Sequence, residues 1–495
     1  MGDITIFAVF GVLLASFLIS LASAWTKRSR LLQDFLFTGN TPLLALSSCI
    51  GSIVSMAVSF TALLSAGYVW GWQILFSIVP GSIAGLLMVL LLSRHPKVME
   101  HQQRVERNTY LLGASYLSVL GEWRSSSGLY AFFIAAYWAM LITELVVLRT
   151  FITFLADLPS IEVTIMIGAV TLVCYAYVYI GGFRGVLVTD YFQLMAVFVF
   201  VGLWLSTTTY HVQIHVPSPM LSKQPLTAPS FLLLHLGVFA GAMAWTFASL
   251  DQWYRTIGTL RIGAARAVLK SAAIALCFFA AVPIITGASA LQRATIPASV
   301  TNGVSLILVA DLLSHSNVTL RFFFVMALTC AALTTLNTYF MTIQQLYYES
   351  STRMETTHWM LYPFEWLLKL KEVRGFALGL GVGAFAVSYV FPHEYVYAFG
   401  VGALSTLILG IPFVSAYLLD AVYPGHALTA LVIPRLNAAL RTAVIAWGLL
   451  LMLVHRCLGS LTAHLYAIPA TALGGAVVGL LVAVTLPVPR AWRRS

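Results

Sequence analysis

Charged residues are scarce in this sequence: Asp, Glu, Lys and Arg make up 9% of its 495 residues, whereas hydrophobic residues make up 60%. This composition excludes a water-soluble domain. Apolar runs long enough to cross about 30 Å of hydrocarbon occur from one end of the chain to the other. No segment between them is long enough to form a separate soluble domain. We therefore expect an integral membrane protein that crosses the bilayer many times.

Cysteine is also scarce, and its placement excludes two further classes. The cysteines lie in apolar runs without a close pair, which indicates neither a disulfide framework nor a zinc site: Cys49, Cys174, Cys277, Cys330 and Cys457. No single span holds a His–Glu pair, a Cys–His pair or a metal-ligand spacing, so a membrane-embedded enzyme ranks last. The net charge of +10 is explained by loop residues that set membrane orientation, and we expect no nucleic-acid partner.

The apolar runs predict an all-α polytopic fold of thirteen transmembrane helices. The predicted spans lie near residues 4–24, 44–66, 73–93, 128–148, 161–180, 188–208, 230–250, 268–289, 320–346, 376–391, 397–419, 440–457 and 465–486. An N-terminus outside and a C-terminus inside place twenty-two of the 27 Lys and Arg residues on the cytoplasmic side. This bias follows the positive-inside rule and supports an odd number of spans.

The stretch Leu46–Gly71 is uncharged and long enough to cross the bilayer, yet serine recurs through it and it contains Gly51. Small polar residues in such a segment meet other helices or a cavity. Glycine and serine also allow the backbone to unwind, which exposes carbonyls that can coordinate a cation. Ordinary packing between helices is the simpler interpretation of this stretch taken alone.

Three further stretches carry polar residues inside or beside predicted spans. In 177–193 the chain passes through Gly181-Gly182 and enters the next span through Asp190. An acid at that depth needs a cation, a partner or water, so Asp190 either pairs with Arg184 at the cytoplasmic surface or lies on a transport pathway. Glu144 and His235 also lie inside spans, where each is either a paired structural group or part of that pathway.

The other two stretches are 242–256 and 331–338. In the first, Trp253 and Tyr254 are typical of the aromatic belt at a membrane interface, whereas Trp245 lies about two turns deeper. In the second, four polar residues occur within five positions: Thr334, Thr335, Asn337 and Thr338. A lone threonine in a span usually donates to the carbonyl four residues earlier, but four polar groups exceed that habit. Hydroxyl and carbonyl oxygens are the hard ligands that a small alkali cation needs.

The run Gly181-Gly182-Phe183-Arg184-Gly185-Val186, with Thr189-Asp190 and Gln193, resembles the GG-x-[KR]-A-V-x-x-T-D-x-x-Q signature of the solute:sodium symporter family. That family includes sodium–sugar, sodium–proline and sodium–sialic acid cotransporters. The order of the other stretches is similar too, so the resemblance covers nearly the whole chain. It implies one transport domain (1–495) with two inverted five-helix repeats and broken second and seventh spans. Its parts are a peripheral helix (4–24), the repeats (44–208 and 230–419) and two C-terminal helices (440–486).

The resemblance also implies the binding residues. The main sodium site takes backbone oxygens of Ser52, Ser55 and Ala331 with the hydroxyls of Thr334 and Thr335, where the family more often has serine. A second sodium site, present in some members, maps to Thr334, Asn337, Thr338 and Asp190. The residues that face the central substrate cavity map to Ser59, Leu63, Trp245 and Ser249. The Asn and Gln side chains with which the family's sugar transporters hold hydroxyls are missing at these positions, which favours a compact solute other than a sugar.

We therefore predict a secondary active transporter in the plasma (inner) membrane that couples sodium influx to uptake of a small solute by alternating access. Its expected partners are the solute, the sodium ion and the lipid bilayer. Two alternatives stay open. The chain is a non-transporting sensor or membrane subunit, with a protein partner at the inner loop 347–374, or it is a symporter driven by protons through Asp190.

Overall fold

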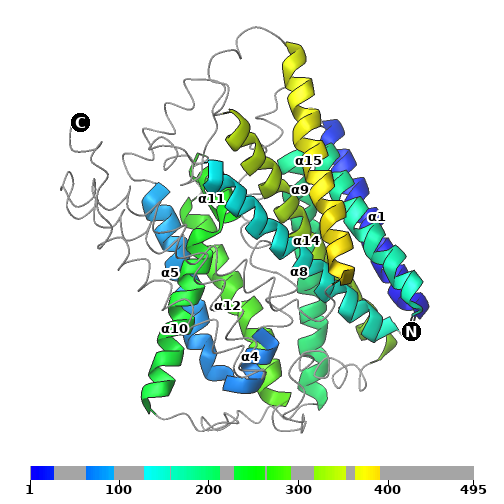
Figure 1. The fold of residues 1–495 in the computed structure, drawn as a ribbon. Helices are drawn as coiled ribbons and strands as arrows, with labels where there is room; N and C mark the ends of the chain where they lie inside the picture. Colours follow the sequence, from blue (N-terminus) through cyan, green and yellow to red (C-terminus); the bar gives the residue numbers. More distant parts are fainter. Residues whose placement is uncertain are drawn as a thin grey trace, which may run out of the picture.

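The computed structural model describes residues 2–26, 63–93, 127–156, 158–211, 228–261, 265–290, 317–352 and 363–390 (Figure 1). The elements in these ranges are helices: α1 (Gly2–Thr26), α4 (Leu63–Trp70), η2 (Trp72–Ile74), α5 (Leu75–Ser93), α8 (Ser127–Ala156), α9 (Ser160–His211), α10 (Ala228–Ala248), α11 (Leu250–Arg261), α12 (Ala265–Ala290), α14 (Val318–Thr352) and α15 (Pro363–Val390). Most of the predicted span 44–66 and the three spans after residue 391 lie outside the described residues.

Six of these helices are long and apolar enough to cross a membrane, so the chain is an integral, multi-pass membrane protein. They cover Gly2–Trp25, Trp72–Leu91, Phe133–Leu155, Ser160–Leu203, Val318–Tyr348 and Glu372–Val390. The fourth of them contains two of the predicted spans. Shorter apolar helical segments, Leu234–Met243 and Phe279–Ala288, lie within two more. Within the described ranges, the hydropathy pattern therefore predicted the long apolar helices correctly, whereas it did not predict α11.

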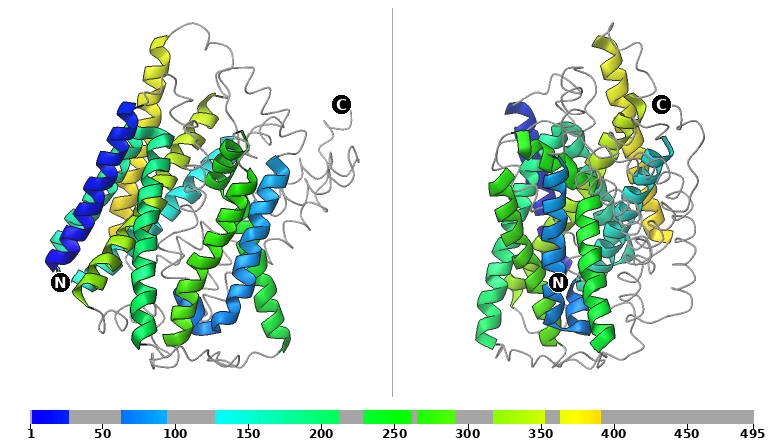
Figure 2. Two further views of the ribbon diagram at one scale, coloured as in Figure 1. Left: turned by 180° about the vertical axis from the view of Figure 1, so that it is seen from behind. Right: turned by 90° about the vertical axis from the view of Figure 1, so that its left-hand side faces the viewer.

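The packed helices form two groups. In the first, α14 packs against α8 and α9, α1 packs against α9, and α15 packs against α8. In the second, α5 packs against α10, and α12 packs against α4 and α5. Figure 1 shows the first group on the right and the second on the left, and the rear view in Figure 2 shows the same division. The short helix α11 contacts α5 and α12 of the second group and α14 of the first.

Apolar side chains fill the interior of both groups. The larger core is centred on α8, α9 and α14, and Leu64, Tyr68 and Phe279 of the second group join it. The rings of Phe198 and Phe279 lie 5.0 Å apart across the junction. A smaller core lies within the second group and includes Trp70, Ile74, Val79, Leu234 and Ile284. Each group is thus held together by its own apolar packing, and the junction between them adds polar contacts from α11.

Helix α9 consists of two helical segments joined at Gly182, whose φ of 56° and ψ of −154° are not helical. An L side chain rarely adopts that φ, which explains a glycine at this position. Gly181 has a different role, because a Cβ there would overlap the hydroxyl of Ser20 on α1. The Ser20 hydroxyl donates to the carbonyl of Tyr177 at 2.8 Å. The Gly-Gly pair therefore provides a turn and a close approach of α1 to α9.

Helices α4 and α12 also approach closely at two glycines. A Cβ on Gly67 would overlap the carbonyl of Ile284, and a Cβ on Gly287 would overlap the carbonyl of Leu64. Small residues at such crossings let backbones come together and gain van der Waals contact in lipid. This contact fixes α4, the described helix that follows the predicted broken second span.

The close packing of α4 on α12 predicts that Gly287→Ala is destabilising. The added methyl group must displace the α4 backbone, which costs about 1–3 kcal/mol in a packed interior. Gly202→Ala is the matched control, because nothing lies within 4 Å of a Cβ at that position on α9. We expect a lower temperature of unfolding in detergent for Gly287→Ala and no decrease for Gly202→Ala. Equal melting temperatures for both variants and the unaltered protein would contradict the proposed contact.

Candidate functional site

Polar side chains of α14 gather where this helix faces α9. Thr334, Asn337 and Thr338 are spaced by three and four positions and therefore share one face of the helix. Each threonine hydroxyl donates to the carbonyl four residues earlier: Thr334 to Cys330 at 2.9 Å, Thr335 to Ala331 at 3.0 Å and Thr338 to Thr334 at 2.7 Å. A hydroxyl that donates in this way keeps oxygen lone pairs available for another donor or for a cation.

The second half of α9 presents the matching face. Asn337 of α14 donates to Asp190 Oδ1 at 3.0 Å and lies 3.5 Å from the hydroxyl of Thr189. The Gln193 Oε1 atom accepts from Thr334 at 2.8 Å, and Gln193 Nε2 donates to Ser16 of α1 at 3.1 Å. All of these side chains are buried. The T-D-x-x-Q part of the signature is thus the set of α9 residues that faces the polar stretch of α14.

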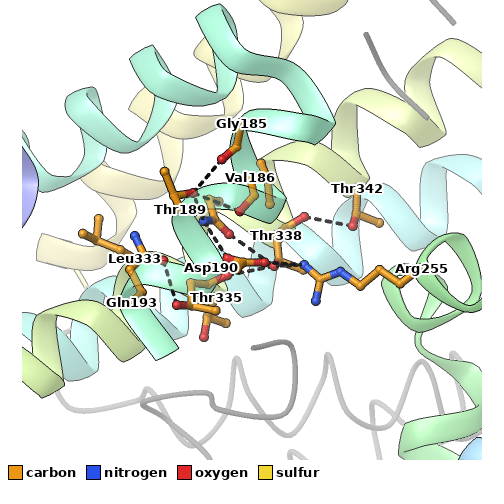
Figure 3. A network of polar contacts seen from close by, with 12 residues as sticks. Gly185, Val186, Thr189, Asp190, Gln193, Arg255, Leu333, Thr335, Thr338 and Thr342 are labelled. Carbon is orange, nitrogen blue, oxygen red and sulfur yellow. Dashed lines mark hydrogen bonds and ion pairs between the residues drawn. The ribbon is translucent and has the colours of Figure 1, made fainter. Parts of the chain in front are cut away.

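The strongest contact of this cluster is a buried ion pair between Asp190 and Arg255 of α11. Arg255 Nη2 lies 3.2 Å from Asp190 Oδ2, and the two side chains are 2% and 0% exposed. The same nitrogen donates to the hydroxyl of Thr338 at 2.6 Å. Figure 3 shows the guanidinium reaching from α11 to the Asp190 carboxylate and Thr338. Removing one partner of such a pair leaves a buried charge and costs about 3–5 kcal/mol.

Helices α10 and α11 are separated by Ser249, which lies at the inner end of the predicted seventh span (230–250). Because α11 begins after this break, its first backbone N–H groups have no carbonyl partner within the helix. The hydroxyl of Tyr137 on α8 accepts from the backbone nitrogens of Leu250 at 2.9 Å and Asp251 at 3.3 Å. It donates to the Asp251 carboxylate at 2.9 Å. Tyr137 therefore caps the broken end and fastens it to the first helix group.

The described residues of the predicted main sodium site lie together on α14. Ala331 is fully buried, and Thr334 and Thr335 are buried one turn beyond it. The oxygen atoms that they offer as ligands are neutral, which suits a singly charged alkali cation. Ser52 and Ser55 lie outside the described residues. The four residues of the predicted second site are also together: Asp190, Thr334, Asn337 and Thr338.

The predicted substrate residues are described only in part. Ser249 is buried at the helix break. Leu63 is half-buried at the start of α4 and packs against the smaller apolar core. Trp245 belongs to α10, but its side chain lies outside the described residues, as does Ser59 altogether. His235 and Glu144 were also predicted inside spans. A ring nitrogen of His235 lies 2.5 Å from the hydroxyl of Ser77, and Glu144 is buried in α8.

Two sequence-based interpretations are wrong. Asp190 pairs with Arg255 rather than with Arg184 at the cytoplasmic surface, because the turn at Gly182 directs the start of the second α9 segment toward α11 and α14. Trp253 and Tyr254 do not form an interfacial belt; both are buried, at 0% and 4% exposure. Their helix, α11, packs between the two groups, so its aromatic side chains join the larger core.

Sequence reasoning missed the roles of Arg255 and Tyr137. The positive-inside count does not distinguish Arg255 from a loop charge. The available signal was its place in a segment rich in aromatic residues, with Trp253 and Tyr254 directly before it. Tyr137 gives no signal in the sequence, because its contact with α11 joins residues more than a hundred positions apart.

No protein-family model and no curated protein matches the sequence. Solved structures do match over nearly the whole chain. A Na⁺-coupled sialic acid symporter in a substrate-bound outward-open state has a TM-score of 0.64 and 15% identity, covering 98% of both chains. A mutant of the manganese transporter of Eremococcus coleocola has a TM-score of 0.52 and 14% identity, covering 92% of this chain and 99% of its own. At these identities the likeness establishes a transporter fold.

The cap on α11 predicts that Tyr137→Phe is destabilising. Loss of the hydroxyl leaves two buried backbone donors and the Asp251 carboxylate without this partner, at a cost of about 1–3 kcal/mol. Tyr389→Phe is the matched control, because the buried Tyr389 hydroxyl has no hydrogen-bond partner among the described residues. We expect only Tyr137→Phe to lower the unfolding temperature in detergent. A similar decrease in both variants would mean that the loss of a buried hydroxyl, and not the loss of the cap, lowers stability.

Proposed function

We propose that this chain is a secondary active transporter of the solute:sodium symporter type, which couples sodium influx to uptake of a small solute. One observation carries the proposal. The residues to which the resemblance assigns ion binding on α9 and α14 lie in one buried polar cluster, inside a fold like that of a Na⁺-coupled sialic acid symporter. Polar groups this costly to bury inside a membrane protein mark ion or substrate pathways.

The main sodium site in this proposal consists of the Ala331 carbonyl and the Thr334 and Thr335 hydroxyls, completed by backbone oxygens of Ser52 and Ser55. Sodium is a transported substrate here. The Thr335 hydroxyl donates its proton to the Ala331 carbonyl, and the single Thr334 proton is shared between the Cys330 carbonyl and Gln193 Oε1, so both oxygens keep lone pairs for a cation. The resemblance places a second sodium site, present in some members of the family, at Asp190, Thr334, Asn337 and Thr338.

The solute in this proposal binds beside the interrupted helices, between Ser59 and Leu63 of the second span and Trp245 and Ser249 of the seventh. A broken helix exposes N–H groups and carbonyls that recognise polar groups of a ligand without a full charge in the membrane. The N–H groups at the start of α11 are already held by Tyr137. We therefore assign solute contacts to the α10 side of the break, where Ser249 lies.

The topology proposed with this function has two inverted five-helix repeats, at 44–208 and 230–419, an outside N-terminus and a plasma-membrane location. The two described helix groups supply the moving parts. Sodium stabilises the arrangement that opens outward and binds solute, and its release inside favours the opposite opening. Sodium can drive the cycle only through different affinities for the two arrangements.

The sodium assignment is tested by Thr334→Ala and Thr335→Ala. Each removes one coordinating oxygen, and we expect the sodium concentration for half-maximal thermal stabilisation to rise at least about tenfold, which corresponds to about 1.4 kcal/mol. The control is Thr329→Ala on the same helix, whose buried hydroxyl makes the same type of bond to Val325 at 2.9 Å. Purified protein is titrated with sodium chloride against choline chloride at constant ionic strength and pH.

Unaltered sodium dependence in both variants would overturn the site assignment. No sodium dependence in the unaltered protein would overturn sodium coupling itself. In that case uptake driven by a pH gradient in choline buffer identifies a proton-coupled transporter. A protein that shows neither response and purifies with a stoichiometric partner is a sensor or subunit instead.

The solute class is tested by a screen of small acids, amino acids and sugars with thermal unfolding as the readout. A ligand at a hundred times its dissociation constant stabilises the folded protein by about 2.7 kcal/mol. We expect a compact solute to raise the unfolding temperature in sodium and to have little effect in choline. A ligand that stabilises equally in both buffers would contradict coupling between solute and sodium.

A further inference from the structure

Arg255 lies in the polar cluster but has no role in the proposed transport cycle. Its side chain is 2% exposed, and it comes from α11, whereas the carboxylate that it meets comes from α9. Asp251, one turn earlier on α11, has partners of its own in the Tyr137 hydroxyl and the start of that helix. Asp190 is the carboxylate that this guanidinium contacts directly, and the buried Asp251 carboxylate also lies within its electrostatic reach.

The contact atoms of Arg255 are those of a cation site. One guanidinium nitrogen lies 3.2 Å from Asp190 Oδ2 and 2.6 Å from the Thr338 hydroxyl oxygen. Asn337 supports the same carboxylate through its other oxygen. Thr338 donates its proton to the Thr334 carbonyl at 2.7 Å, so its oxygen receives Arg255 as it would receive a metal ion. Two of the four residues expected to hold a second sodium ion, Asp190 and Thr338, thus already contact a positive charge.

We propose that Arg255 is the resident cation of the Asp190–Asn337–Thr338 site and that it excludes a second sodium ion, so that this protein binds sodium only at its main site. The inference concerns ion stoichiometry and rests on the proposed function for its place in transport. Two cations on one buried carboxylate repel each other strongly, because little water screens them. A sodium ion would also have to lose its hydration shell, whereas the guanidinium is already held there by the fold.

Arg255 also links the two helix groups. The guanidinium joins α11, which packs on α5 and α12, to α9 and α14 of the first group. A free sodium ion at the same place would satisfy Asp190 without fastening α11. The tethered cation thus provides both the charge that Asp190 needs and a polar link across the junction.

The test counts the sodium ions that purified protein binds at equilibrium, with radioactive sodium in choline buffer. We expect one bound sodium ion in the unaltered protein. We also expect one in the double variant Asp190→Asn with Arg255→Gln, which lacks both charges of the ion pair. We expect Arg255→Gln to gain a second ion, because its Asp190 carboxylate is left open. Arg255→Lys retains a positive charge and is expected to gain none. Lys270→Gln, an exposed charge removal on α12, is the control and is expected to leave the count unaltered.

If Arg255→Gln fails to fold, the ion count of the double variant tests whether Asp190 binds sodium in the native protein. An ion count in the double variant equal to that of the unaltered protein supports the proposal. Loss of one ion would overturn it, since Asp190 would then be a sodium ligand in the native protein. Arg255→Gln protein that folds and gains no ion would overturn it as well. If the unaltered protein binds no sodium, the proposed function fails, but a gain that appears in Arg255→Gln and disappears in the double variant still supports the role of Arg255.

Discussion

The buried ion pair between Asp190 and Arg255 is the interaction on which the interior of this protein depends. A carboxylate with no exposed surface is stable only if a cation and hydrogen-bond donors take the place of water. Asn337 supplies a donor and Arg255 supplies the charge, so α14 and α11 must both approach α9 at this point. The same guanidinium nitrogen that meets Asp190 also donates to the Thr338 hydroxyl. The positions of three helices are therefore coupled through one carboxylate.

This coupling gives α11 a special place in the molecule. It follows the interruption at Ser249, its first N–H groups are capped by Tyr137, and its guanidinium reaches Asp190. Both anchors belong to the first helix group, whereas α11 also packs on α5 and α12 of the second. A relative displacement of the groups would have to break or exchange these polar contacts. Interactions that differ between two arrangements of the helix groups are what shift the balance between them.

The sequence predicted local features well and long-range contacts poorly. Hydropathy located the long apolar helices among the described residues. The sequence predicted that one span ends at Gly181-Gly182 and that a separate span follows, whereas α9 continues as helix on both sides of Gly182. Sequence spacing alone could not reveal that Arg255, counted as a loop charge, is folded inward to meet Asp190 sixty-five positions away. It also misplaced Trp253 at the membrane interface, because an aromatic residue near a helix end has the same local pattern whether lipid or protein surrounds it.

An experimental structure determined in sodium and in choline would test the central claim most directly. The account predicts sodium-dependent density bounded by Ala331, Thr334 and Thr335, with the Arg255 guanidinium on Asp190 in both conditions. Density for an ion between Asp190 and Thr338, with Arg255 displaced from the carboxylate, would contradict it.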